Sequence, residues 1–136
     1  MRTLKELLIV LCFLSLIEII TSCEKKAGSD NMFLISVDSV KLPEGIIVNT
    51  SFDILCYGTV GTDGCNSFSR FETEKLNNII TVETWGEFHE SSSACPDVMV
   101  YLEGEKLNFK LEETGSYLLR MKRKDGTYLE RQIIVE

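Results

Sequence analysis

The sequence predicts an all-β protein: a β-sandwich of about seven to nine strands formed by residues 32–136. Three observations support this fold class. Apolar and polar side chains alternate in several short stretches, which puts one side of a strand in a core and the other in water. Turn-forming residues recur about every ten residues, and an Asp-Gly pair separates two alternating stretches near the C-terminus. Short strands at this spacing are typical of sandwiches.

The first two expected strands are apolar stretches near the start of the domain. Residues 33–37, FLISV, are apolar and rich in β-branched side chains. In residues 50–58, TSFDILCYG, the side chains of Phe52, Ile54 and Cys56 fall on one face. Cys56 is therefore expected to be a buried thiol, which behaves as a small hydrophobe.

The middle of the chain contains one ambiguous pattern and one clear pattern. The apolar residues of 68–76 have a helical spacing, but a turn pair and another strand follow directly, so a strand at 70–75 is preferred over a helix. In residues 78–88, two aliphatic side chains share one face. Trp85 lies on the opposite face between two glutamates, so its ring is a candidate contact for a sugar or a protein.

The last third of the chain alternates most clearly. Four further stretches are expected as strands: 98–102, 106–112, 116–124 and 127–135. Gly104 is expected to form a turn between the first two of them. Asp125-Gly126 separates the last two, and the predicted tight turn requires positive φ at both of its positions.

The N-terminal segment predicts export. A start containing Arg2 and Lys5 precedes the uncharged run 7–17, LLIVLCFLSLI. This run is shorter than the roughly 20 apolar residues that a membrane-spanning helix needs. A basic start, a short apolar run and small residues at its end are typical of a secretory signal peptide, expected at residues 1–22.

Residues 20–23, ITSC, resemble a bacterial lipobox, the motif that is cleaved before a cysteine that then carries lipid. The resemblance implies that Cys23 is the mature N-terminus, that its acyl chains, palmitate among them, hold it in a membrane, and that the protein belongs to the bacterial cell envelope, with the outer membrane favoured. Residues 23–31 are then a lipidated cysteine and flexible tether. The alternative is an ordinary signal peptide that leaves Cys23 as a spare thiol.

Charge and cysteine content narrow the function classes. The net charge is −7, and removal of the signal peptide leaves it unchanged because two basic and two acidic residues go with it. An acidic chain without a basic patch is not suited to nucleic acid. Export leaves Cys56, Cys65 and Cys95 where disulfides persist, and three thiols allow one bridge.

Five stretches of the chain together carry a further resemblance: GCNSFSRFE, NIITVET, ACPDV, LNFKL and GSYLLRM. Over about residues 40–136 the chain is similar to a group of uncharacterised small secreted bacterial lipoproteins that have an immunoglobulin-like β-sandwich domain. The resemblance implies that Cys65 and Cys95 form the disulfide and that Tyr117 occupies the position of a tyrosine corner. The loop positions of the two cysteines agree with this pairing.

Residues suited to catalysis or metal binding are sparse, so no catalytic residue, metal site or cofactor is expected. His89 is the only histidine, and no C-x-x-C pair of the kind that structural zinc sites use is present. A Cys–His nucleophile pair needs a free thiol, which the expected bridge and burial remove. The glycine-rich stretch 58–64 lacks the ending of a phosphate-binding loop, and we expect a connection there.

The expected function is that of a lipid-anchored, non-catalytic binding or accessory module, whose partners are the membrane and a protein or glycan of the cell envelope. The alternatives are an inhibitor of a secreted protease or other envelope enzyme and, with less support, an enzyme. A Cys65–Cys95 bridge would bring the loops 58–66 and 89–96 to one end. The candidate binding residues are Asp63, Asn66, Trp85, His89 and Glu90. Two interpretations compete with this site: the loops are only hydrophilic connections, and Trp85 packs beneath a loop or the N-terminal segment.

Overall fold

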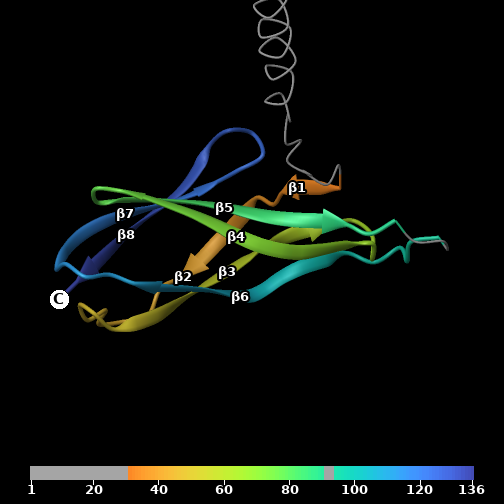
Figure 1. The fold of residues 1–136 in the computed structure, drawn as a ribbon. Coiled ribbons are helices and arrows are strands. Elements are labelled where there is room, and N and C mark those ends of the chain that lie inside the picture. Colours follow the sequence, from red (N-terminus) through yellow and green to blue (C-terminus); the bar gives the residue numbers. More distant parts are fainter. Residues whose placement is uncertain (1–30, 91–93) are drawn as a thin grey trace, which may run out of the picture.

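The computed structural model of the chain describes residues 31–90 and 94–136, and the expectations for the signal peptide, Cys23, the tether and residues 91–93 lie outside these ranges. Two sheets face one another (Figure 1). The strands are β1 (Met32–Leu34), β2 (Val37–Lys41), β3 (Ser51–Gly61), β4 (Asn66–Leu76), β5 (Ile79–Phe88), β6 (Val100–Lys110), β7 (Gly115–Lys122) and β8 (Tyr128–Val135). No helix in the described ranges is long and apolar enough to cross a membrane.

The large sheet is built around β5. Strand β4 pairs with β5 along its whole length in an antiparallel hairpin. The other edge of β5 is shared: β7 pairs with its first half in parallel, and β1 pairs with its second half in antiparallel orientation. Strand β8 then pairs with β7. Beyond β8, the sheet is extended by the segment after β2, because Ile46 forms a parallel bridge to Val135.

The small sheet has the order β2-β3-β6, with antiparallel pairs throughout. Its inner face and that of the large sheet form one core, because most strands place alternate side chains toward the other sheet. Strand β4 contributes only the partly buried Phe68 and Phe71. The core contains Ile35, Val37, Ile54, Cys56, Val60, Ile80, Val82, Leu102, Leu107, Tyr117, Leu119, Met121, Ile133 and Val135. This arrangement confirms the predicted all-β sandwich at the level of class and layers.

Several sequence predictions are confirmed in detail. Residues 70–75 belong to β4, so the helical spacing of this stretch does not produce a helix. Cys65 and Cys95 form a disulfide, and Cys56 is free and fully buried. The apolar faces expected for the last two strands point inward, as the buried pattern of β7 and β8 shows.

The prediction of one strand over residues 33–37 is wrong. Strand β1 ends at Leu34 in the large sheet, and β2 begins at Val37 in the small sheet. The chain crosses between the layers at Ile35 and Ser36, and the side chains of Ile35 and Val37 are fully buried. The run is apolar because it passes from one sheet to the other and places Ile35 and Val37 in the core between them.

The turn expected at Gly104 is also wrong, because β6 continues through it. Cys56 pairs with Glu105 and Tyr57 pairs with Glu103, which leaves Gly104 as the extra residue of a β-bulge. Its φ is 91°, and a Cβ placed there would lie 3.2 Å from the hydroxyl of Tyr57. Glycine is thus required by the backbone and by the neighbouring ring.

The connection expected at residues 58–64 begins later than predicted, because β3 extends to Gly61. Gly58 lies where β3 passes the crossing segment, and a Cβ there would be 2.8 Å from the carbonyl oxygen of Ser36. Gly58 therefore allows a close approach of two backbones, and the turn itself occupies only the residues between Gly61 and Asn66.

The hairpin predicted at Asp125-Gly126 is confirmed, but its turn type is wrong. Only Gly126 has positive φ, at 82°. The Arg123 amide donates to the Thr127 carbonyl at 2.9 Å, and the Gly126 amide donates to the Arg123 carbonyl at 3.0 Å. These bonds define a three-residue loop in which a left-handed glycine ends the turn.

Candidate binding site

The disulfide brings two connections to one end of the sandwich, as the sequence predicts. Cys65 closes the β3–β4 turn, and Cys95 lies in the β5–β6 connection. Two backbone hydrogen bonds tie the same connections together: Gly64 donates to the Pro96 carbonyl, and His89 donates to the Cys65 carbonyl, each at 2.8 Å. Asp63, Asn66, His89 and Glu90 therefore lie at this end.

The polar groups of Asp63 and Asn66 are engaged within the turn. The carboxylate of Asp63 accepts from the Cys65 amide at 3.0 Å and from the side-chain amide of Asn66 at 2.8 Å. This geometry is an Asx-type turn, and its first effect is to fix the backbone that carries Cys65. The Asp63 carboxylate also lies near the sulfurs of Cys65 and Cys95, but the disulfide removes both thiolates that a metal would need.

His89 is an exposed functional group at this end. Its Nε2 lies 2.9 Å from the Glu87 carboxylate and 3.0 Å from the Ser67 hydroxyl. All three side chains come from neighbouring positions at the ends of β4 and β5, because Ser67 and Glu87 are register partners. Glu90 follows as an exposed residue.

Trp85 lies on the outer face of the large sheet rather than in the loops. Its register partners are Arg70 on β4 and Leu34 on β1, so strands flank it on both sides. The Arg70 side chain extends across β5, since its guanidinium lies 3.9 Å from the Met32 sulfur on β1. Trp85 is half-buried, and its indole Nε1 is buried without a hydrogen-bond partner among the described residues. These strands, β1 of the N-terminal segment included, leave only part of the ring for a ligand.

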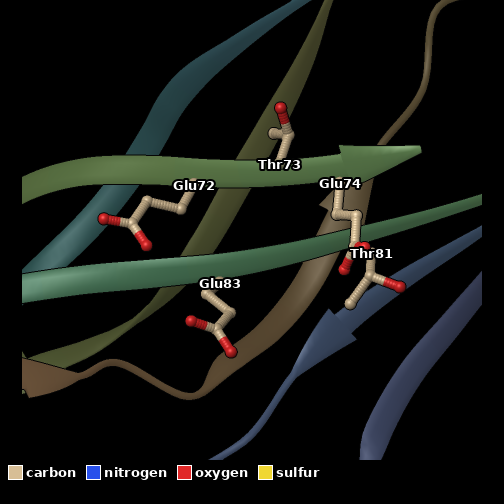
Figure 2. A pocket seen from close by; sticks show the side chains of 5 residues that line it. All are labelled: Glu72, Thr73, Glu74, Thr81 and Glu83. Atoms are coloured by element: carbon tan, nitrogen blue, oxygen red, sulfur yellow. The ribbon is translucent and has the colours of Figure 1, made fainter.

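The outer face of the large sheet is charged in its middle. A shallow hollow there is lined by Glu72, Thr73 and Glu74 of β4 and by Thr81 and Glu83 of β5. Figure 2 shows the three glutamates on one side of the strands and Thr73 on the other side of β4.

The cations of this charged middle are paired. Lys122 forms an ion pair with Glu83, and Arg120 pairs with Glu130 at 2.8 Å. The hydrogen bond to Glu83 raises the pKa of Lys122. The positive charges of β7 are thus matched within the sheet.

An apolar row crosses the same face beyond the charged middle, and sequence reasoning missed it. Leu76, Ile79 and Leu118 are register partners on β4, β5 and β7. Ile134 of β8 pairs with Ser116, two residues before Leu118 on β7, and so faces the same side, and Ile47 follows the buried Ile46 that bridges to β8. Leu76, Ile134 and Ile47 are 67%, 61% and 60% exposed. The signal was present in the sequence, because Ile134 alternates with the inward-facing residues of its strand.

The disulfide and the apolar row lie at opposite ends of the sandwich. The Phe88 amide donates to the Asn31 carbonyl at 2.9 Å, so the described chain enters at the disulfide end. The β4–β5 turn and the C-terminal residue lie at the opposite end (Figure 1). We call these the entry end and the far end. The disulfide cluster occupies the entry end, and the apolar row occupies the far end of the outer face.

Comparisons with protein-family models, with curated proteins and with solved structures give no match for this chain.

Proposed function

We propose that this protein is a lipid-anchored, non-catalytic binding module of the bacterial cell envelope, exported with a signal peptide at residues 1–22 and held by lipid on Cys23. The observation that carries the proposal is the lipobox-like stretch ITSC at residues 20–23, directly after a short apolar run. Asn31 lies at the entry end. Residues 24–30 link Cys23 to Asn31, and an extended chain spans about 3.3–3.6 Å per residue. The entry end is then held within roughly 30 Å of the lipid.

We further propose that the sandwich is of the immunoglobulin-like type. Tyr117 supports this, because it lies near the start of β7 and its hydroxyl donates to the Glu113 carbonyl at 2.9 Å, four residues upstream. This bond is the defining contact of a tyrosine corner. The parallel pairing of β5 with β7 and the disulfide between two end loops are departures from the constant-type domain.

Binding, rather than catalysis, is the role that the described surface favours. The outer face of the large sheet combines a half-buried tryptophan with an exposed apolar row, which are features of contact surfaces. Sheets also hold such side chains in fixed positions, so a partner meets a surface that needs little ordering.

The anchor is tested by metabolic labelling with a fatty-acid analogue. We expect the wild-type protein to incorporate the label and to fractionate with membranes. Cys23→Ala should lose both properties, while Cys56→Ala serves as a matched cysteine control that keeps them. Equal labelling of wild type and Cys23→Ala would overturn the anchor.

Binding is tested separately from the anchor. A panel of secreted hydrolases incubated with the purified protein distinguishes the inhibitor alternative, which requires tight inhibition of at least one of them. A panel of hydrolase substrates incubated with the protein alone tests for an enzyme. The binding module predicts no effect in either panel.

A further inference from the structure

We propose that the apolar row at the far end of the outer face is the docking surface for a protein partner, and that this partner presents apolar side chains bordered by lysine or arginine. The inference deepens the proposed function. It rests on the lipid anchor only for the direction in which the row faces.

The row is continuous across the sheet. Leu76, Ile79 and Leu118 are direct neighbours in register, and strands lie about 4.8 Å apart, so these side chains form an unbroken band. Ile134, which pairs with Ser116 and so lies diagonally from Leu118, and Ile47 extend the apolar surface over β8 and the segment that bridges to it. Single exposed apolar residues are ordinary, but a contiguous exposed group marks an interaction site.

The face, rather than the open edge of β4, is the contact surface. Among the described strands, β4 pairs only with β5, so none of them pairs with its other edge. That strand carries a register irregularity near Ser69 and the charged residues Arg70, Glu72, Glu74 and Lys75. Bulges and charges are the features by which natural edges avoid pairing with other strands.

The chain's own tether does not reach the row once Cys23 is in the membrane. Strand β5 separates Phe88 at the entry end from Ile79 in the row, and ten residues at about 3.3 Å each put them roughly 30 Å apart. Residues 24–30 already span the distance between lipid and Asn31. We therefore expect the anchoring membrane beside the entry end, opposite the row.

Charge argues against a second copy and for a basic partner. Arg120 forms an ion pair with Glu130, and Lys122 forms one with Glu83. Glu74, two residues before Leu76 on β4, is in no ion pair within the described ranges. Each copy carries a net charge of −7, so stacking two copies face to face would bring two acidic molecules together. A basic rim on the partner would complement Glu74 instead.

The test is site-specific photo-crosslinking in cells, with a photoreactive residue at position 76 or 134. Position 101 is the matched control, because Tyr101 is 52% exposed on the outer face of the small sheet. We expect one protein adduct at positions 76 and 134 and none at 101. Mass spectrometry of the adduct should show apolar residues with lysine or arginine beside them at the attachment point.

Charge variants sharpen the same experiment. Leu76→Lys and Glu74→Lys should each lower the yield of the adduct formed from position 134 at least tenfold. Tyr101→Lys should leave that yield unchanged. All three replaced side chains are exposed, so unchanged thermal unfolding would show that the variants remain folded.

Every other result counts against the proposal. An adduct of the protein with itself would mean that the row binds a second copy, and a lipid adduct would mean that it contacts a membrane. An attachment point bordered by acidic residues would contradict the expected basic rim of the partner. Absence of any adduct at both positions also overturns it. Membrane fractionation in the same cells reports on the anchor alone, so a soluble protein with the expected adduct would refute the anchor and keep the docking surface.

Discussion

At the scale of single residues, the core contains two buried polar groups, the Thr84 hydroxyl and the Cys56 thiol. Thr84 points inward from β5 and is 0% exposed, and its hydroxyl has no hydrogen-bond partner among the described residues. A buried hydroxyl without a partner costs free energy, because it gives up its bonds to water. Cys56 occupies the equivalent environment in β3 as a free thiol.

Replacing Thr84 by valine should stabilise the protein. The change keeps the branched shape and removes the unpaired hydroxyl, so we expect the free energy of unfolding to rise by about 1 kcal/mol. Denaturant unfolding measures it. Thr81→Val on the outer face of the same strand is the control and should change little. A loss of stability in Thr84→Val would mean that the hydroxyl has a partner in solution.

Cys56 should be unreactive in the folded protein. Burial, reinforced by the charge of Glu105, raises its pKa from 9.0 to about 12, so the thiolate is scarce at neutral pH. Alkylation should modify no thiol of the folded domain, and exactly one after unfolding without reductant. Because the folded pKa is raised, stability should be intact below pH 9.0 and should fall as pH rises toward 12. Three domain thiols after unfolding would refute the disulfide.

At the scale of elements, alternation predicted which residues face the core, but not which strands pair. Period two assigned the buried faces of β3, β5, β7 and β8 correctly, because burial selects side chains directly. It could not predict the crossing at Ile35–Ser36 or the parallel pairing of β5 with β7, since partner choice depends on long-range contacts. Gly104 was mistaken for a turn because turns and bulges both use glycine with positive φ.

Two glycine substitutions separate backbone strain from crowding. Gly126→Ala places a side chain where φ is 82° but no atom lies within 4 Å, so we expect a loss of about 1 kcal/mol. Gly104→Ala adds contact with the Tyr57 hydroxyl at φ 91°, so the expected loss is larger, about 2–3 kcal/mol. Chemical denaturation of both variants measures the difference. Equal losses would show that the bulge tolerates the extra atom.

At the scale of the whole molecule, the disulfide and the entry of the chain define one end, and the apolar row lies at the other. The bridge joins residues 30 positions apart and stabilises the fold by about 3–4 kcal/mol in the loop-entropy model. The sequence predicted the cysteine pair and the end that it organises. It did not predict the row, because its members come from four strands and the segment after β2, and only the register brings them together.

Only some residues of the binding site predicted from the sequence lie together with exposed side chains at the entry end. Asp63 and Asn66 serve the turn, and Trp85 lies in the sheet between Arg70 and Leu34. Hydrogen bonds inside a turn leave no trace in composition, so sequence reasoning treated its polar residues as available. His89 and Glu90 keep the exposed positions expected of them, and their role in binding remains a prediction.

The central claim is that Cys23 holds the domain with its entry end toward a membrane and its apolar row away from it. Energy transfer from a fluorophore on the domain to acceptor lipids in vesicles tests it most directly. One fluorophore replaces Asp97 at the entry end and another replaces Leu76 at the far end, in otherwise identical lipidated protein. We expect strong transfer from position 97, weak transfer from position 76, and none from either position in Cys23→Ala. Equal transfer from both positions, or stronger transfer from position 76, would contradict the account.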